Sequence, residues 1–451
     1  MIPRHSALPR AGKLTALGMG VALLATACGG PTGTPPGTGT TTAAPAGVAC
    51  PVPSEPVGAG TSPAEPTSVP AATTTSETPL KIGSLLPVTG NLAFLGPPEI
   101  AGVNYAIKRI NDVGGVLGHP VEVIHRDSGD TKTDLATQSV TNLLGQDVGA
   151  IVGAASSSVT RTVINQITGA GVVQMSPANT GTDLTTWDDK GLYWRTAPSD
   201  VLQGRVLGNY IASCGVQTLG MIVLNDAYGT SLQRTVTEAF EGAGGKVVAA
   251  ELYNTGDSQF STQVDKVLAA KPDAVAVISF DEAKQILPLL TGKGIKGNQL
   301  FLVDGNTLDY SKDFQPGTLV GAHGTQPGTF AKADFQAALR EIDPALRDYN
   351  YAGESYDAVN VIALASEAAK SVDGTDIAQQ LKAVSQGGEK CTGFASCVTL
   401  LREGKDIDYD GYSGPISFTD AGDPSEAFIG IYEFGEDNKN KPIKSEFGKL
   451  G

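Results

Sequence analysis

Two short turns rich in hydroxyl side chains are the parts of this 451-residue sequence best suited to hold a ligand. The first, Ser156–Ser158, follows the apolar run Ala150–Gly153 and precedes a segment with helical periodicity. The second, Ser176–Thr180, follows the strand-like run Val172–Met175. Hydroxyl groups and the free backbone N–H groups at the start of a helix both donate hydrogen bonds to anions. Together the two turns predict a seat for a small carboxylate.

No set of residues with catalytic spacing accompanies these turns. The sequence has no Gly-x-Ser-x-Gly elbow, no phosphate-binding P-loop and no dinucleotide fingerprint at its first predicted strand. Its four histidines (His5, His119, His125, His323) lack the spacing of metal ligands. We therefore expect a binding protein that is not an enzyme and that carries no metal and no cofactor.

The elements that must position the two turns alternate between strand and helix. From Leu80 to Asp304, runs of strand length alternate with segments whose apolar residues recur at helical spacing. This alternation is typical of parallel sheets with helices on both faces, and turns that follow parallel strands open at the same edge of a sheet. The number of predicted strands favours two lobes, so the fold class is α/β.

The C-terminal third departs from this alternation. It contains three helical stretches and then two closing strands, predicted over Phe330–Ile342, Tyr356–Ser371, Thr375–Ser385, Gly414–Phe418 and Ala427–Phe434.

The formal net charge of −15 argues against nucleic acid as a partner, because phosphate binding needs a clustered positive field. Beyond the N-terminus, no stretch approaches the roughly 20 apolar residues of a membrane span.

The N-terminus has the pattern of an export signal. Residues 1–27 place basic side chains before an apolar run that is too short to span a membrane. The run ends in small residues followed by Cys28, which resembles the lipobox of bacterial lipoproteins and makes Cys28 the expected lipidation site. An ordinary secretory signal with an incidental cysteine is the alternative. Residues 28–79, rich in Thr, Pro, Ala and Gly, then read as a disordered linker.

Export would allow the other four cysteines to form disulfides. Cys391 and Cys397 enclose a short loop and are expected to pair locally. Cys50 and Cys214 remain, and they could pair to tie the linker to the folded body.

From Leu80 to its end, the chain resembles the leucine/isoleucine/valine-binding proteins, a family of type I periplasmic binding proteins that serve ABC importers. The resemblance rests on motifs in a fixed order: LKIGSLLPVTGNLAFLG, INDVGGVLGHPVEVIHRDSGD, IVGAASSS, SPANT, NDAYG, PDAVAVISF, FLVDG, LVGAHGTQP and GPISFTDAGD. Each motif is weak alone, whereas their order and spacing together are specific.

The resemblance implies two lobes, each a parallel sheet flanked by helices, joined by three hinge crossovers. The first lobe would comprise residues 80–197 and 326–412, and the second residues 198–325 and 413–451. The crossovers would fall near Arg195–Ser199, His323–Pro327 and Tyr412–Gly414.

The family's ligand site transfers to this sequence residue by residue. It implies that Ser157 and Thr180 hold the ligand's carboxylate with their hydroxyls and that Ala178 contributes a backbone contact. Tyr228 would reach the ligand from the second lobe, and Asp304 would hold its ammonium group.

The resemblance also implies that Phe94 and Phe280 form the wall around the ligand's side chain. The sequence departs from several relatives where they bridge the first hydroxyl turn to an earlier loop with a disulfide, because Ser156 and Ser128 occupy those places here.

We therefore expect a membrane-anchored, extracytoplasmic substrate-binding lipoprotein. It would bind a small amino acid, branched-chain or otherwise aliphatic, by hinge closure and pass it to an ABC permease. One alternative keeps the fold but binds urea, a short amide, or an aromatic or organic acid. A second is a ligand-sensing ectodomain that signals to a partner.

Overall fold

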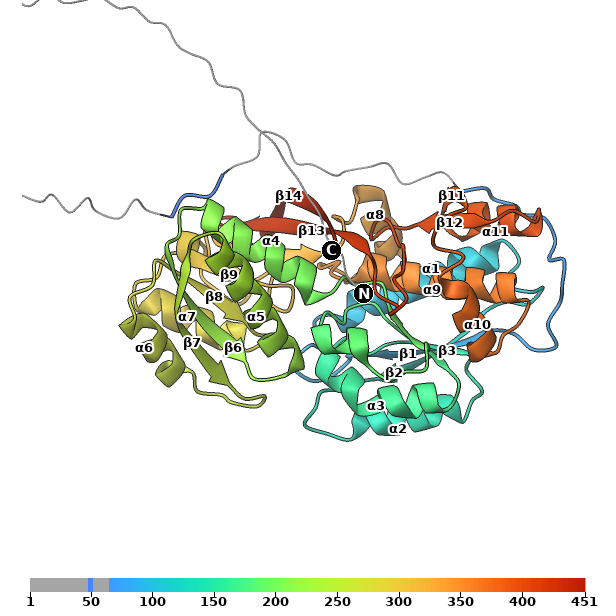
Figure 1. Ribbon diagram of the computed structural model, residues 1–451, viewed down its shortest axis with the longest axis horizontal. Helices are drawn as coiled ribbons and strands as arrows, with labels where there is room; N and C mark the ends of the chain where they lie inside the picture. The colour runs from blue at the N-terminus through green and yellow to red at the C-terminus, as the bar shows by residue number, and fades with distance from the viewer. Residues whose placement is uncertain (1–47, 52–64, 451) are drawn as a thin grey trace, which may run out of the picture. The chain divides into compact units, whose positions relative to one another are not determined.

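Two large β-sheets organise the chain, as Figure 1 shows for this computed structural model, which describes residues 48–51 and 65–450. The five-stranded sheet has the order β2-β1-β3-β4-β5, and all of its strands are parallel. The seven-stranded sheet has the order β14-β13-β10-β9-β8-β6-β7 and is antiparallel only where β13 meets β10 and β14. The fold is α/β, as the alternating pattern predicts.

The first lobe contains the five-stranded sheet, a small two-stranded sheet and the helices around them. Its elements are β1 (Lys81–Leu86), α1 (Gly96–Asp112), β2 (Glu122–Asp127), α2 (Leu135–Leu144), β3 (Ala150–Gly153), α3 (Ser157–Gly169), β4 (Val173–Ser176), the 3-10 turn η1 (Thr182–Thr186), β5 (Tyr193–Arg195), α8 (Ala333–Ile342), α9 (Ala352–Ala369), α10 (Gly374–Leu381), β11 (Glu389–Thr392), α11 (Phe394–Arg402) and β12 (Ile407–Asp410).

The second lobe contains the seven-stranded sheet. Its elements are α4 (Asp200–Ser213), β6 (Thr218–Leu224), α5 (Ala227–Gly242), β7 (Lys246–Tyr253), α6 (Ser261–Ala269), β8 (Ala274–Ile278), α7 (Ala283–Gly292), the 3-10 turn η2 (Gly297–Gln299), β9 (Leu300–Leu302), β10 (His323–Pro327), β13 (Glu426–Phe434) and β14 (Asn440–Lys449).

Strand β3 shows how the first sheet is buried on both faces. Ala150 and Val152 belong to the apolar core that the sheet shares with α1 and α9. Ile151, between them, points the opposite way, into the core formed with α2 and α3, which lie together in Figure 1. Successive side chains of a strand alternate between faces. The fully apolar sequence of this strand therefore reflects helices on both sides of the sheet.

Helices α1 and α9 approach each other closely at Gly102. A side chain there would begin 2.3 Å from the carbonyl oxygen of Ala352, so only glycine allows this contact. This close pair of helices covers one face of the first sheet, where α1 contacts β1 and α9 contacts β3.

The chain passes between the two sheets three times: from β5 to α4, from β10 to α8, and through residues 411–425 between β12 and β13. The second passage follows His323–Pro327 directly. His323–Pro327 form strand β10 of the second sheet, and the chain leaves that sheet at Gly328, whose φ of 86° favours glycine.

The predicted closing strand Gly414–Phe418 is wrong. Only isolated bridges form there, between Asp410 and Pro415 and between Phe418 and Pro424, because each bridge involves a proline that lacks an N–H group for a ladder. The strand that does close the sheet's edge beside β13 is β14, whose lysine-rich sequence gives little strand signal.

The N-terminal segment differs from the expected disordered linker where it is described. Residues 65–79 contain no helix or strand, yet they lie against the first lobe. Both carboxylate oxygens of Glu65 accept hydrogen bonds, one from the Tyr356 hydroxyl (3.2 Å) and one from the Ala395 N–H (3.3 Å) at the start of α11. A helix N-terminus attracts a carboxylate, which explains why this chain segment is held.

Both pairs of cysteines in the described chain are joined. Cys50–Cys214 ties residues 48–51 to the end of α4, and Cys391–Cys397 ties β11 to α11. The predicted signal peptide over residues 1–27 and the predicted lipidation site at Cys28 lie outside the described residues. Within residues 48–51 and 65–450, no helix combines the length and apolarity that crossing a membrane requires.

Candidate functional site

The three serines of the first turn have three different roles. Ser156 is the N-cap of α3, and its Oγ accepts a backbone N–H from the first turn at 3.3 Å. Ser158 donates to Asp226 of the second lobe at 2.9 Å. Ser157 is buried, and its Oγ accepts the N–H of Gly181 at 3.1 Å. Because no described residue accepts a bond from the Ser157 hydroxyl, that hydroxyl can donate to a ligand.

The second turn is tied directly to the first. The Ser176 hydroxyl donates to the carbonyl of Ala154 at 2.7 Å and accepts the Asn179 N–H at 2.9 Å. The Asn179 side-chain amide donates to the carbonyls of Ala154 and Ala155 at 2.9 and 2.8 Å. The two turns predicted to share a sheet edge are therefore parts of one hydrogen-bonded unit.

Thr180 is fully buried at the back of this unit. Its carbonyl accepts the N–H of Asp200, at the start of α4, at 2.7 Å. Its hydroxyl makes no hydrogen bond of good geometry with a described residue, although it lies close enough to Asp200 to help lower the pKa of that carboxyl. Thr180 thus links the second turn to the first hinge crossover.

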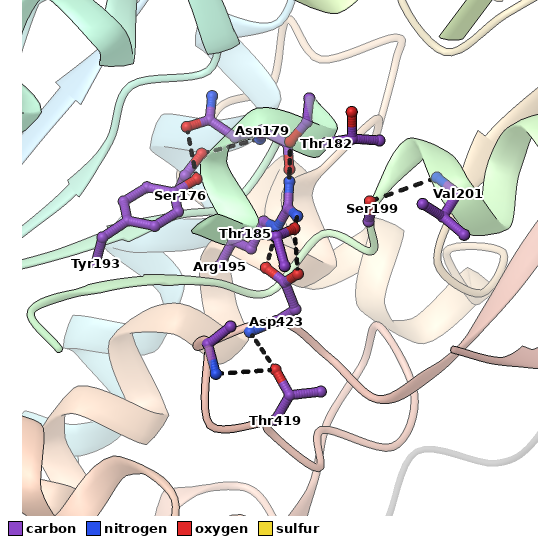
Figure 2. A network of polar contacts seen from close by, with 12 residues as sticks. Ser176, Asn179, Thr182, Thr185, Tyr193, Arg195, Ser199, Val201, Thr419 and Asp423 are labelled. Carbon is purple, nitrogen blue, oxygen red and sulfur yellow. Dashed lines mark hydrogen bonds and ion pairs between the residues drawn. The ribbon is translucent and has the colours of Figure 1, made fainter. Parts of the chain in front are cut away.

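A buried ion pair holds the second turn against the hinge, as Figure 2 shows. Arg195 donates from Nη1 to the carbonyls of Asn179 (3.3 Å) and Gly181 (2.9 Å), which flank Thr180. Its Nε donates to Asp423 at 2.6 Å, and Thr185 bridges the two side chains. Asp423 belongs to the third crossover, so one guanidinium fixes both the ligand-facing turn and the hinge.

A small pocket lies where this unit faces the second lobe. Five of the seven residues predicted to contact a ligand line it: Ser157, Ala178, Tyr228, Phe280 and Asp304. Its other lining residues are Leu92, Leu95, Ala155, Ser156, Gly305 and Tyr351. The pocket is small, with a cavity volume of about 10 Å³, roughly the space of one ordered water.

The structure places Phe94 and Thr180 outside the lining of this pocket. Phe94 is half-buried and packs against the apolar core of the second lobe, whereas Leu92 and Leu95 of the same loop point into the pocket. Thr180 is fully buried, and its carbonyl accepts the N–H of Asp200 at the start of α4. The neighbouring side chains of a tight loop point in different directions, which the sequence alone does not reveal.

Asp304 carries the negative charge of the pocket. Its Oδ1 accepts the hydroxyl of Tyr228 at 2.6 Å and the side-chain amide of Gln203 at 2.8 Å, and its Oδ2 accepts the hydroxyl of Tyr351 at 2.6 Å. All three donors are neutral. Burial raises the pKa of Asp304, and these hydrogen bonds oppose the rise. The carboxylate is therefore held in place without a cation of the described chain beside it.

A second buried carboxyl makes the site more acidic. Burial, and then the charge of Asp304, raise the pKa of Asp200 to about 7, against the hydrogen bond from Ser231 and the nearby Thr180 hydroxyl. Two carboxyls in one dry region disfavour each other's ionised form, and a positive ligand group would relieve this. The electrostatics of the site consequently favour an ammonium group near Asp304.

The remaining walls are apolar. The ring of Tyr228 stacks on that of Phe280 with centroids 5.1 Å apart and planes 19° apart. Leu92, Leu95 and Ala155 face them from the first lobe. The pocket thus combines hydroxyl and N–H donors, a carboxylate, and an apolar surface between them, which is the set of groups that an aliphatic α-amino acid requires.

Direct bonds between the lobes surround the pocket. The Asn91 side chain donates to Glu282 at 3.1 Å, and its carbonyl accepts the Asp281 N–H at 3.3 Å. Arg234 donates to the Thr182 hydroxyl at 3.2 Å. With Ser158–Asp226, these bonds join the first lobe to the second in this structure.

Sequence reasoning missed Gln203 and Tyr351, the two residues that complete the shell around Asp304. Gln203 lies in the first turn of α4, where a helical glutamine gives no functional signal. Tyr351 precedes α9 with a φ of 58°, a left-handed conformation that is uncommon for tyrosine. A local sequence pattern does not reveal such a conformation.

Comparisons with known proteins identify what this chain is similar to. The sequence profile of a family described as "Periplasmic binding protein" matches residues 79–412. A "Leucine-, isoleucine-, valine-, threonine-, and alanine-binding protein" of Pseudomonas aeruginosa is 28% identical over 317 residues, 67% of this chain and 82% of that protein.

A "Chemotactic signal transduction system substrate-binding protein BasB" of Halobacterium salinarum is 24% identical over 363 residues, 78% of this chain and 86% of that protein. Among solved structures, the branched-chain amino acid transporter substrate-binding protein LivJ of Streptococcus pneumoniae, in complex with isoleucine, superposes with a TM-score of 0.68. The match covers 83% of this chain and 100% of that one at 23% identity, so it speaks for the fold.

Proposed function

The chain belongs to the periplasmic binding protein family, and on that premise we propose that it captures a small aliphatic amino acid outside the cytoplasm and passes it to an ABC permease. The observation that supports this proposal is that hydrogen-bond donors of one lobe and a carboxylate of the other line the same pocket. Ser157 and the second hydroxyl turn offer donors from the first lobe, and Asp304 offers a carboxylate from the second.

In this proposal the ligand's carboxylate binds Ser157 and the backbone around Ala178. Its ammonium group binds Asp304, where it would be the only cation in contact with that carboxylate among the groups described. Charge-assisted hydrogen bonds of this kind are about twice as strong as neutral ones. The side chain rests against Leu92, Leu95 and Phe280, whose limited space favours an aliphatic group.

Hinge closure couples binding to recognition by the permease. The ligand binds groups of both lobes, so it stabilises the closed form in proportion to its preference for that form. The bonds of Asn91 with Glu282 and of Ser158 with Asp226 add to the closed state. The permease would distinguish the loaded protein by this arrangement of the lobes, and the ligand undergoes no chemical change.

We also propose that a lipid on Cys28 holds the protein at the membrane surface. Acyl chains contribute about 0.8 kcal/mol per buried methylene group, so more than one chain is needed for stable attachment. A Cys28→Ser variant that stays in the membrane fraction would contradict this part of the proposal.

A thermal-shift screen of the mature chain tests the ligand. Leucine, isoleucine, valine, threonine and alanine are compared with urea, a short amide and an aromatic acid. At 100 times its dissociation constant, a ligand adds about 2.7 kcal/mol to the free energy of unfolding. We expect the aliphatic amino acids to produce the largest shifts. A shift with the amide or the aromatic acid alone would overturn the ligand assignment.

Similarity to the chemotactic substrate-binding protein supports a second use of the same closed form. In that case the loaded protein would activate a signalling partner instead of feeding a permease. The two uses share a ligand site and differ in what recognises it. Amino-acid uptake by cells that express or lack the protein separates them, because a purely sensory protein leaves uptake unchanged.

A further inference from the structure

A second pocket lies at the hinge, away from the ligand pocket described above. It has a volume of about 230 Å³, and residues of both lobes line it, including Glu354, Tyr351, Phe330, Tyr412, Tyr432 and Lys332. We call it the hinge pocket. A dry apolar cavity of about 150 Å³ suffices for benzene, so the hinge pocket has room for a small organic molecule.

Glu354 is the unusual group of the hinge pocket. It lies in the first turn of α9 and is only 4% exposed, yet no other described residue donates a hydrogen bond to its carboxylate. Its carboxylate rests against Gly328, where a side chain would begin 1.9 Å from Glu354 Oε1. The absence of a side chain at Gly328 therefore leaves the space that the Glu354 carboxyl group occupies. Burial, and then the charge of Asp357, raise the pKa of Glu354 to about 8, so the carboxyl is protonated at neutral pH and a cation beside it would favour its ionised form.

The charged groups near Glu354 do not neutralise it. Glu99 of α1 and Asp357 of α9 are carboxyls that disfavour a further negative charge. Lys332 is half-buried and Arg347 is exposed, and neither forms an ion pair with Glu354 within the described chain.

Aromatic rings form much of the remaining wall. Phe330 and Tyr432 meet edge to face, with centroids 5.2 Å apart and planes 88° apart. The ring of Tyr412 stacks on that of Phe335, with the ring centroids 3.9 Å apart. Burial, and then the charges of Asp348 and Glu354, raise the pKa of Tyr432, so its hydroxyl lies within electrostatic reach of both carboxyls. A carboxylate among aromatic faces is an environment that attracts ammonium groups.

We propose that the hinge pocket binds a small molecule carrying an ammonium group, with the ammonium against Glu354 and the apolar part among Phe330, Tyr412 and Tyr432. This site is separate from the amino-acid pocket and goes beyond the function proposed above. Its ligand supplies the positive charge and the hydrogen-bond donors that the described protein groups do not.

Binding in the hinge pocket would act on the ligand pocket through Tyr351. This residue lines both pockets, and its hydroxyl holds Asp304 at 2.6 Å. The hinge-pocket walls also come from both lobes, with Glu354 on α9 and Tyr432 on β13. An occupant therefore favours the closed arrangement in which Tyr351 reaches Asp304, and by linkage each ligand strengthens the binding of the other.

The test uses 2-phenylethylamine as the probe and 2-phenylethanol as its neutral match, titrated into the mature chain by calorimetry. We expect the amine to bind about 10-fold or more tightly than the alcohol, since the two differ only in the charged donor group. Glu354→Gln should weaken amine binding about 10-fold or more. The matched control Glu238→Gln, on the exposed face of α5, should leave it unchanged.

Two further variants place the amine in the hinge pocket. Ala331→Phe fills the pocket while keeping the Glu354 carboxyl, and it should abolish binding, which keeps the test decisive if Glu354→Gln fails to fold. Asp304→Asn should leave the amine site able to bind, because Asp304 belongs to the other pocket. Loss of amine binding in Asp304→Asn alone, equal affinity for amine and alcohol, or no effect of either hinge-pocket variant would overturn the proposal.

Discussion

Arg195 Nε donates a 2.6 Å hydrogen bond to Oδ1 of Asp423, 228 residues further along the chain, and both side chains are almost completely buried. The same guanidinium donates to the backbone of the turn that faces the ligand. The two hinge crossovers and the proposed carboxylate seat therefore share one structural element. A substitution at the hinge should therefore change the affinity for the ligand.

Asp423→Ala should reduce the free energy of unfolding by about 3–5 kcal/mol, because it leaves the Arg195 charge buried without its partner. It should also weaken amino-acid binding, since Arg195 positions the carbonyls on either side of Thr180. Urea titration and calorimetry measure the two effects. Asp112→Ala, which breaks an exposed i,i+4 pair with Lys108, is the control and should cost less than about 1 kcal/mol. If the two variants lost the same free energy of unfolding, burial would not be the reason why the Arg195–Asp423 pair matters.

Asp304→Asn should weaken amino-acid binding about 10-fold or more, because it removes the charge that pairs with the ligand's ammonium group. The isolated protein should lose about 1–3 kcal/mol of stability, because the amide nitrogen places a donor where the carboxylate accepts buried hydrogen bonds. Calorimetry and thermal unfolding measure the two quantities. Phe94→Leu is the control because Phe94 lies outside the pocket lining. Undiminished affinity in Asp304→Asn would exclude an ammonium contact there.

Glu99→Gln should stabilise the protein increasingly as the pH rises from 5 to 8. Both carboxylate oxygens of Glu99 are buried without a partner, and burial, followed by the charge of Glu354, raises its pKa well above the ordinary 4.5. Above pH 4.5 the unfolded carboxyl ionises while the folded one stays protonated. Folding then takes up a proton, and stability falls as the pH rises, by about 1.4 kcal/mol per pH unit at most.

The Gln variant does not titrate, so its advantage over the unaltered protein should be small at pH 5 and largest at pH 8. Urea unfolding at the two pH values measures it, and Glu238→Gln serves as the exposed control. A difference that is the same at both pH values would show that Glu99 is ionised in the folded protein.

Removal of the Cys50–Cys214 disulfide should cost more stability than removal of Cys391–Cys397. The first bond closes a loop with a sequence separation of 164 residues and the second a loop of 6. In the chain-entropy model, each bond lowers the entropy of the unfolded chain. The first bond thereby adds roughly 5 kcal/mol to the free energy of unfolding, and the second roughly 2 kcal/mol. Paired Cys→Ser variants, compared by thermal unfolding, test the order. The reverse order would show that native-state effects dominate.

The sequence predicts the residues whose position depends on a strand end, and it misses those positioned by distant packing. Ser157 follows a predicted strand, so periodicity places it at a sheet edge, whereas Asp304 is implied by the family resemblance; both line the pocket. Tyr351 reaches the pocket only because α9, far along the chain, packs on α1. No local pattern connects these elements.

The direction in which each side chain of a loop points is equally hard to predict. Phe94 has the side chain expected of a pocket wall, but Leu92 and Leu95 occupy that place. Glu65 reads as part of a disordered linker, although it binds Tyr356 and the start of α11. In both cases the outcome depends on partners that are remote in sequence.

The late position of β13, β14 and Asp423 has a consequence for how the protein is made. Strand β13 pairs with β10 near the middle of the second sheet, and Asp423 neutralises an arginine placed 228 residues earlier. The ion pair cannot form before Asp423 has been synthesised, and the second sheet cannot be complete before β14 has been. Contacts of such high sequence separation slow folding. The chain thus cannot reach its final fold before residues beyond Asp423 have been synthesised.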